Sequence, residues 1–432
     1  MEKVTFEVET ITPMFLAGND QKKVKVPGRH QKFDSTSPLN TDDYSWQKVA
    51  ELRASSIRGL MRYWQRAIVG SLATTNTERM RLIKQAEKEI FGTTEHGSAI
   101  QIRVERLNIH IHDFIEEISK PNPQSGQYEA TDKGYLLFSL VEGGNKKAND
   151  TIEKINQEYR HNTKTKQEKR QGEEISAYQP PRQYIAEGSK FRITLSVHSS
   201  TPKGKELLQK ATTAFWLLAN LGGIGSRSRR CAGSIRVTKV ENNLTNLSFD
   251  ASQNTEQLQA QLKYGIEYIC QLWKTDFSKA ISASKQVSVE VASFDILDLV
   301  SEPKSSHIWI LPDNKGTWNS SEDAMKDIGG SLKDYRPTLT LEERAIFGLP
   351  IIVQKGRNQP DDEEFEDLLK YLKKARMASP LLLRVSWLQS NQYVGLAVLF
   401  KTEGKYVSYM DDYQFINDFI KENYPDALEV TL

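Results

Sequence analysis

The sequence predicts an α+β fold whose first half runs strand, helix, strand, strand, helix, strand. Alternating apolar and polar residues indicate strands around Val4, over Lys190–His198 and over Ser234–Val240. Apolar residues at helical spacing indicate helices over Ser55–Val69 and Glu206–Leu221. With two polar insertions set aside, this order is the ferredoxin-like (RRM-like, βαββαβ) arrangement. The 432 residues exceed a typical single domain, so we expect two domains.

The chain begins with a half-buried strand, because Val4, Phe6 and Val8 alternate with polar residues before Pro13. Residues 19–50 are polar and contain two prolines, so we expect a long excursion or mobile loop there. A helix is expected to begin at Ser55 or Ser56, which are good N-caps, and to run to about Val69. The further helices expected in the first half cover about Glu78–Ile90 and Glu206–Leu221. The further strands expected cover Gly97–Ile111, Lys190–His198 and Ser234–Val240, and a short apolar run lies at Tyr135–Val141.

Two polar stretches interrupt this pattern. Residues 143–181 are rich in Lys, Glu, Gln and Asn and predict a flexible insertion or protruding arm. Residues 242–256 are rich in Asn, Ser and Thr, and we place a domain boundary there, giving domains 1–245 and 246–432 with insertions at about 19–50 and 143–181. The elements expected beyond it are a helix at about 258–273, a strand over Val287–Leu297, a helix opening at Pro360, strands over Leu381–Leu388 and Tyr393–Phe400, and a helix at about 412–423.

Composition excludes several classes of protein. A net charge of +2 excludes a histone-like basic protein, although it allows a local basic surface. The two cysteines, Cys231 and Cys270, cannot build a disulfide framework, and the absence of CxxC argues against a cysteine zinc site. The acidic first strand is unlike a signal peptide, and no apolar run is long enough to span a bilayer. We therefore expect a cytoplasmic protein without a cofactor, a metal or a membrane partner.

A glycine- and arginine-rich segment, Gly222–Arg230, lies between a predicted buried helix and a predicted strand. Its glycines permit positive φ angles and close approach of a ligand, and its arginines supply forked donors suited to phosphate. A P-loop is excluded, and Ser228 occupies the third glycine position of a dinucleotide fingerprint. The segment predicts an RNA-binding loop that contacts the nucleic-acid backbone. The alternative is a glycine-rich turn with solvated arginines.

Arginines also recur every four residues, at Arg58, Arg62 and Arg66, on one face of the predicted helix after Ser55. A polyanion would relieve the repulsion between these like charges, and a helix N-terminus can itself hold a phosphate. The competing interpretation is a solvated face whose arginines pair with acids elsewhere.

Candidate catalytic or metal-binding groups are sparse. His110 and His112 lie close together but have no third ligand nearby, so a polar strand face is the better interpretation. Asp20, His30 and Asp34 fall in the polar segment after the first strand and are candidates for a ribonuclease site. No motif of a known nucleophilic or metal-dependent enzyme stands beside them.

Short blocks along the chain carry a family resemblance. They are Ile11–Gly18, Glu51–Trp64, Ile90–Gly92 with Gly97–Ser98, Leu221–Arg230 with Gly233–Ser234, Ile346–Pro350 and Arg376–Arg384. In this order they resemble the RAMP superfamily of CRISPR proteins, and within it the first subunit of the type III-B Cmr effector complex. Cys231 and Ala232 depart from the pattern at the far end of the glycine-rich loop.

The resemblance implies two tandem ferredoxin-like domains with long insertions. It also implies a non-catalytic subunit that binds the crRNA 3′ region and target RNA at one end of a multi-subunit complex in antiviral defence, beside other Cmr subunits. The RNA contacts carried over are Arg53, Arg58, Arg62, Gly222, Gly223, Gly225, Arg227, Arg229 and Arg230, with Lys164, Lys166, Lys169 and Arg170 as further candidates. Two alternatives stay open: a RAMP-type endoribonuclease that processes crRNA or cuts target RNA, and a scaffold whose arginines bind acidic proteins.

Overall fold

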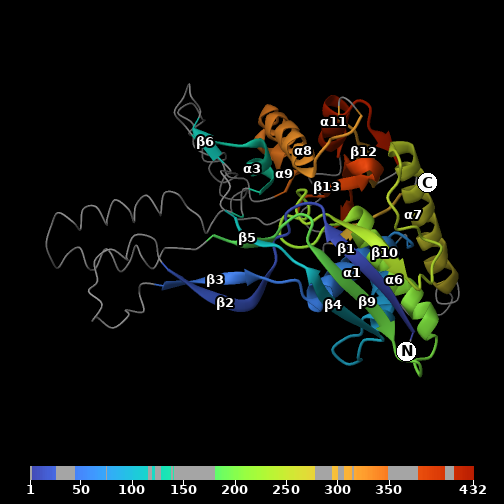
Figure 1. Ribbon diagram of the computed structural model, residues 1–432. Coiled ribbons are helices and arrows are strands. Elements are labelled where there is room, and N and C mark those ends of the chain that lie inside the picture. The colour runs from blue at the N-terminus through green and yellow to red at the C-terminus, as the bar shows by residue number, and fades with distance from the viewer. Residues whose placement is uncertain are drawn as a thin grey trace, which may run out of the picture.

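The computed structural model describes residues 2–25, 44–73, 75–114, 119–121, 128–137, 140, 181–277, 294–299, 306–313, 316–348, 378–403 and 413–432. It is a mixed α/β structure with antiparallel sheets (Figure 1). The predicted helix at Pro360 lies outside these residues. So does the predicted arm at 143–181 except for Pro181, together with its candidates Lys164, Lys166, Lys169 and Arg170.

The first four-stranded sheet is built from the first half of the chain. Its strands are β1 (Glu2–Thr10), β4 (Ile100–Asn108), β9 (Lys190–Val197) and β10 (Ile235–Glu241), and its helices are α1 (Ala54–Gly70), α2 (Asn76–Ile90) and α6 (Gly204–Leu221). The strand order is β10-β1-β9-β4, so the first strand lies between the fourth and the third. Each of these predicted elements is confirmed, with ends that shift by a few residues.

The second four-stranded sheet is built from the second half of the chain. Its strands are β12 (His307–Leu311), β13 (Leu381–Leu388), β14 (Gln392–Leu399) and β16 (Leu428–Glu429), and its helices are α8 (Ser321–Tyr335) and α11 (Gln414–Asn423). The strand order is β13-β14-β12-β16, so here too the first strand lies between the fourth and the third. The remaining elements are α7 (Thr255–Phe277), β11 (Phe294–Ile296), 3₁₀ turns η5 (Arg336–Thr338) and η6 (Gln389–Asn391), α9 (Leu341–Ala345) and β15 (Lys401–Glu403).

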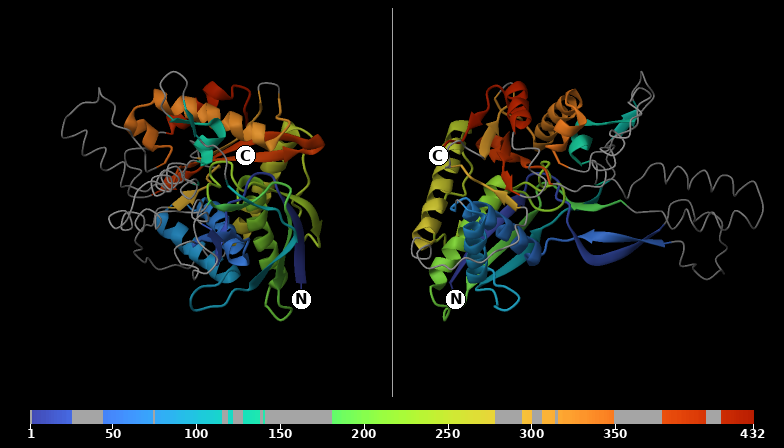
Figure 2. Two further views of the ribbon diagram at one scale, coloured as in Figure 1. Left: turned by 60° about the vertical axis from the view of Figure 1, so that its left-hand side comes forward. Right: turned by 180° about the vertical axis from the view of Figure 1, so that it is seen from behind.

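Of the two expectations for residues 19–50, a long excursion agrees with the structure, whereas a mobile loop is wrong where the chain is described. β2 (Ala17–Lys25) and β3 (Tyr44–Ala50) pair as an antiparallel ribbon that projects from the body (Figures 1 and 2). Polar residues on both faces hide this ribbon from a periodicity argument, since no apolar alternation marks it. The other small elements are β5 (Ile111–Asp113), β6 (Ser119–Pro121), β7 (Tyr128–Ala130), α3 (Asp132–Leu137) and β8 (Gln183–Ile185).

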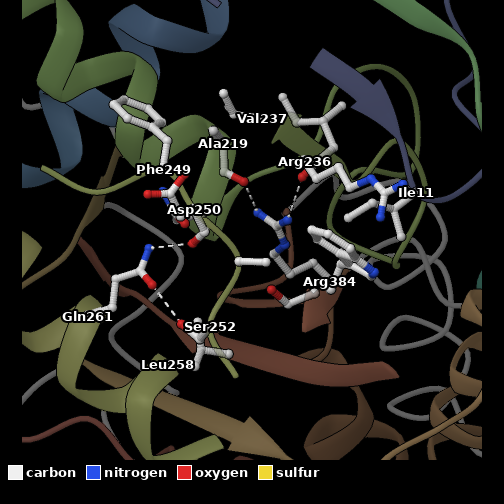
Figure 3. A pocket seen from close by; sticks show the side chains of 15 residues that line it. Ile11, Ala219, Arg236, Val237, Phe249, Asp250, Ser252, Leu258, Gln261 and Arg384 are labelled. Atoms are coloured by element: carbon white, nitrogen blue, oxygen red, sulfur yellow. Dashed lines mark hydrogen bonds between the residues drawn. The ribbon is translucent and has the colours of Figure 1, made fainter. Parts of the chain in front are cut away.

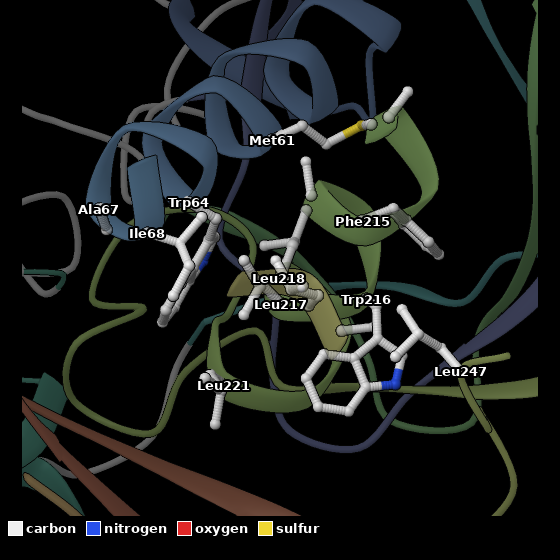
Figure 4. Close-up of a cluster of buried hydrophobic side chains, with 14 of the residues drawn as sticks. Met61, Trp64, Ala67, Ile68, Phe215, Trp216, Leu217, Leu218, Leu221 and Leu247 are labelled. Atoms are coloured by element: carbon white, nitrogen blue, oxygen red, sulfur yellow. The ribbon is translucent and has the colours of Figure 1, made fainter. Parts of the chain in front are cut away.

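The main core lies between the first sheet and helices α1, α6 and α7. Met61 and Trp64 of α1 pack with Phe215 and Leu218 of α6, all fully or almost fully buried (Figure 4). The α7 backbone approaches closely because Gly265 faces the Trp216 ring, where a Cβ would lie 2.3 Å from two ring carbons. Thus α7, which follows the predicted boundary, packs into the core of the first half.

The second sheet is buried on both faces. Leu382, Leu396 and Val398 belong to the main core, whereas Leu383 and Leu399 belong to a second core with α8 and α11. Strands buried on both sides read as continuous apolar runs, as in β12, although Arg384 and Ser386 interrupt the run in β13. α3, from the first half of the chain, packs on α8 through Gly329, so the two halves interlock there as well.

Candidate nucleic-acid interface

The glycine–arginine loop, residues 222–234, runs between α6 and β10 against the second half of the chain. Ser226 N–H donates to Phe15 O at 2.8 Å, which fixes one side of the loop to the connection between β1 and β2. On the other side, Cys231 N–H donates to Leu383 O at 2.8 Å, and Leu383 N–H donates to Arg229 O at 3.1 Å. Backbone hydrogen bonds therefore hold the loop between the two halves of the molecule.

The loop glycines are required by the protein's own packing. Gly225 has φ +100°, and a Cβ there would lie 2.5 Å from Phe15 O. Gly233 has φ +68°, and a Cβ would lie 1.9 Å from Ile224 O. A side chain at Gly222 would meet the Trp64 indole nitrogen at 2.4 Å, and one at Gly223 would meet backbone of the same loop. These contacts explain the glycines without a ligand, because L side chains cannot occupy such space.

One buried guanidinium from the second half holds both ends of the loop. Arg384 of β13 is 1% exposed; its Nη1 donates to Ala219 O at 2.7 Å and its Nη2 to Ile235 O at 3.1 Å (Figure 3). Burial lowers the pKa of Arg384 to about 9. A buried charge without acid partners costs free energy, and hydrogen bonds to carbonyls offset part of that cost.

Arg229, predicted as an RNA contact, is engaged inside the protein. Its guanidinium pairs with Asp295 of β11, donates to Ser379 O at 2.5 Å, and lies 5.6 Å from the ring centroids of both Tyr63 and Phe400. Burial opposes its charge, but Tyr63 and Asp295 outweigh this and raise the pKa of Arg229. The side chain therefore joins α1 to the second half of the chain.

Arg230 is also directed inward. It is 8% exposed, and its Nη2 donates to Phe347 O at 2.7 Å. Burial, followed by repulsion from Arg336 and Arg227, lowers its pKa to about 9. The sequence could not distinguish these inward arginines from solvated ones, because their partners are more than sixty residues away in the chain.

Arg227 lies in a cluster of positive side chains at the loop's partly exposed edge. Its backbone adopts φ +61°, and its Nε is buried without a partner among the described residues. Burial and the Arg336 guanidinium lower the pKa of Arg227. Arg336 follows α8, donates to Tyr135 OH at 2.9 Å, and likewise has a buried Nε with no partner in the described part of the chain. Adjacent cations with unused donors form a favourable site for an anion.

The arginines on the predicted face of α1 differ in whether they pair with an acid. Arg62 Nε and Arg66 Nε donate to the same Glu87 Oε1 of α2, at 3.1 and 2.5 Å. Burial raises the pKa of Glu87, but hydrogen bonds from Arg62 and Arg66 outweigh burial and leave the pKa lowered. For these two arginines the interpretation of pairing with acids accounts for the charges.

Arg53 and Arg58, unlike Arg62 and Arg66, have no acidic partner among the described residues. Arg58 is partly exposed and has no hydrogen bond or ion pair with a described residue, and Arg53 Nε is buried without a described partner. Arg53 itself is the N-cap of α1, so the predicted N-caps Ser55 and Ser56 are wrong by two to three residues. The first turn of α1 holds no acid, which leaves its amide end electropositive.

Arg53 and Arg227, which have no partner in the described part of the chain, both lie near the base of the ribbon. Ser226, next to Arg227, bonds to Phe15; Ala17 then pairs with Ala50, three residues before Arg53. The loop edge and the N-terminus of α1 thus meet at the base of β2–β3.

The open face of the first sheet is charged rather than aromatic. RRM domains stack bases on aromatic residues of this face. Here the only aromatic residues of the four strands, Phe6 and Phe191, are fully buried in the main core. The open face carries paired charges, including Arg192 with Glu7 at 2.9 Å and with Glu105 at 3.4 Å. It therefore lacks the features of an RNA-stacking platform.

Of the candidate ribonuclease residues, only Asp20 lies in the described part of the chain. Asp20 is exposed on β2, while His30 and Asp34 lie outside the described residues. His110 and His112 are exposed, and among the described residues no group of three His, Cys, Asp or Glu side chains is arranged to hold a metal ion. Within the same residues, no helix combines the length and apolar character needed to cross a membrane.

Sequence reasoning missed Arg336, Tyr135 and Trp46. Trp46 is a lone tryptophan in a polar segment, which is a usable signal of an exposed aromatic. Arg336 and Tyr135 come together only through the packing of α3 on α8, which no local pattern reveals.

A sequence model of the RAMP superfamily matches residues 7–236. Among characterised relatives, the chain is 24% identical over 313 residues to "CRISPR system Cmr subunit Cmr1-1" of Pyrococcus furiosus, covering 72% of this chain and 73% of that protein. It is 28% identical over 246 residues to "CRISPR system Cmr subunit Cmr1-2" of the same organism, covering 55% of this chain and 96% of that protein.

Solved structures show the same fold. The crystal structure of Cmr1 from Pyrococcus furiosus in its apo form superposes with a TM-score of 0.53 at 20% identity, covering 100% of this chain and 99% of that one. A chain of the type III-B Cmr-beta complex bound to cognate target RNA superposes with a TM-score of 0.56 at 13% identity, covering 98% of each. The chain therefore belongs to the RAMP superfamily, and within it resembles the first subunit of the type III-B Cmr complex.

Proposed function

We propose that the protein is a non-catalytic RNA-binding subunit of a type III-B CRISPR (Cmr) effector complex. In this role it binds the crRNA 3′ region and target RNA at one end of the complex, beside other Cmr subunits. The observation that carries the proposal is the set of arginines without a partner among the described residues, Arg53, Arg58 and Arg227. Arg53 and Arg227 lie next to the base of the ribbon in the chain, and Arg58 follows Arg53 in the first turns of α1. The likeness to a chain from a complex bound to target RNA supports the same function.

The chemistry of this surface fits an RNA backbone. Guanidinium groups give forked donors to phosphate, and contacts to phosphate and sugar carry no base sequence. Sequence choice then comes from pairing between guide and target, while the protein holds the backbone. We extend the phosphate site to Arg336, whose guanidinium faces Arg227 from the second half of the chain.

The arginines of the loop divide between two roles. Arg227 contacts RNA, whereas Arg229 and Arg230 support the loop, since their donors are used by Asp295, Ser379 and backbone carbonyls. The loop glycines act with them by letting the loop pass close to Trp64 and Phe15. Arg62 is a supporting residue as well, because Glu87 holds it.

We also propose that the chain consists of two tandem ferredoxin-like units, 1–245 and 246–432, with insertions in the first. The identical strand order of the two sheets supports this division. Because α7 and β13 pack into the main core, the two units share one core and fold together.

The test is photo-crosslinking in the assembled complex. A guide RNA carrying 4-thiouridine near its 3′ end is expected to crosslink to this subunit, whereas one labelled near its 5′ end is not. Charge reversal at Arg58 is expected to weaken the 3′ crosslink, with Arg103→Glu on the open sheet face as the control. A crosslink confined to the 5′ region, or one insensitive to Arg58→Glu, would overturn the proposal.

A further inference from the structure

The β2–β3 ribbon has two unlike faces. Lys23 pairs with Trp46, and Gln21 pairs with Lys48. Side chains alternate between the faces of a strand, so Lys23, Trp46 and Lys48 share one face. Gln47 points the other way and is 2% exposed.

The inner face anchors the ribbon. Gln47 Nε2 donates to Asp113 Oδ1 at 2.9 Å and to Pro181 O at 2.7 Å. These hydrogen bonds fix the orientation of β3, and alternation then directs Trp46 away from the body. The tryptophan is thus held outward by the register of the ribbon.

Trp46 is 55% exposed, the largest exposed fraction among the large apolar side chains of the described residues. Five of the other six tryptophans are at most 8% exposed, and Trp387 is half-buried beneath Arg236. An indole ring is large and apolar, so leaving it in water forgoes considerable hydrophobic stabilisation. The exposed ring offers a flat apolar surface on which a planar group can stack.

The charges around the ring favour a polyanion. Lys23 Nζ lies 5.3 Å from the Trp46 ring centroid, and the two strands together carry four lysines and one aspartate. Basic side chains beside an exposed aromatic ring are the arrangement by which proteins bind single-stranded nucleic acid, with a base on the ring and phosphates on the cations.

We propose that Lys23, Trp46 and Lys48 form a stacking site for a nucleobase of single-stranded RNA. This inference rests on the proposed RNA-binding function and adds a contact to bases, whereas the arginines contact the backbone. The ribbon's base adjoins Arg53 and Ser226, so a strand bound at the arginines can continue outward along the ribbon (Figures 1 and 2).

The test uses intrinsic tryptophan fluorescence of the full-length chain titrated with unstructured oligoadenylate. RNA is expected to quench the fluorescence, and Trp46→Phe is expected to abolish the quenching while retaining most of the affinity. Trp46→Ala is expected to weaken binding between about 5-fold and about 150-fold, the usual range for one stacked base. Leu107→Ala, at a 43% exposed apolar residue on β4, is the matched control and should leave binding unchanged.

The outcomes separate the two proposals. If RNA affinity depends on Arg53, Arg58 and Arg227 but changes less than about twofold in Trp46→Ala, the stacking site is wrong and the proposed function stands. If the wild-type chain does not bind RNA, both are wrong. Burial of Trp46 from acrylamide in an RNA-free assembly of neighbouring subunits would show a protein partner instead and overturn the stacking site.

Discussion

Replacing Arg229 with alanine separates a structural role from an RNA contact. The guanidinium is 23% exposed and Asp295 is 11% exposed, so the pair is largely shielded from solvent. Removing one partner of a buried pair costs about 3–5 kcal/mol, and charged hydrogen bonds are worth about 1.5–3 kcal/mol each. Asp295 keeps the hydrogen bond from Tyr63 OH at 3.0 Å, which limits the loss. We expect Arg229→Ala to lower the free energy of unfolding by about 3 kcal/mol.

The assay is urea unfolding followed by circular dichroism, paired with RNA affinity under folded conditions. Arg62→Ala is the control, because Arg62 is 35% exposed and Glu87 keeps Arg66 as a partner; we expect a loss of about 1 kcal/mol or less. A double-mutant cycle with Asp295→Asn should give a coupling above about 1 kcal/mol. Unchanged stability in Arg229→Ala together with a large loss of RNA affinity would refute the structural role.

Three further changes test the packing of the loop and of α1. Gly233→Ala should destabilise the protein by at least about 2 kcal/mol, measured by thermal unfolding, because its Cβ would overlap Ile224 O. Arg384→Met should cost about 2–5 kcal/mol in urea unfolding, since two buried carbonyls lose their donors. Glu87→Gln should cost about 1 kcal/mol at pH 7. Because the folded pKa of Glu87 lies below 4.5, that difference should be present above pH 4.5 and vanish as the pH falls through the folded pKa.

The fold is predictable where one face of an element is apolar. β1 and β9 alternate cleanly, and α6 carries an apolar stripe, so their positions follow from periodicity. β12 and α8 were missed although both carry signals: β12 is a continuous apolar run, and α8 starts at an N-cap serine and places Ala324, Met325, Ile328 and Leu332 at helical spacing. The β2–β3 ribbon carries no such signal because polar and charged side chains interrupt both of its faces and leave no continuous apolar stripe.

For the candidate site, the sequence predicts which residue types are present but not which side chains face outward. Glycines and arginines in residues 222–234 mark the loop, but which arginines face outward depends on distant partners such as Asp295 and Phe347. Glu87 likewise removes Arg62 from the predicted surface, through the packing of α2 on α1. Local sequence therefore identifies the segment, and tertiary contacts decide the role of each side chain.

The salt dependence of RNA binding measures how many phosphate groups the protein contacts. Affinity of the purified chain for single-stranded RNA is measured over a range of salt concentrations for wild type, the triple variant Arg53→Ala, Arg58→Ala, Arg227→Ala, and the control Arg103→Ala. Each lost phosphate contact reduces the slope of log affinity against log salt by about 0.7. If Arg53, Arg58 and Arg227 each contact a phosphate, the slope falls by about 2 in the triple variant, equally for RNAs of different sequence, and stays unchanged in the control. Equal slopes and affinities in the triple variant and wild type would contradict these contacts.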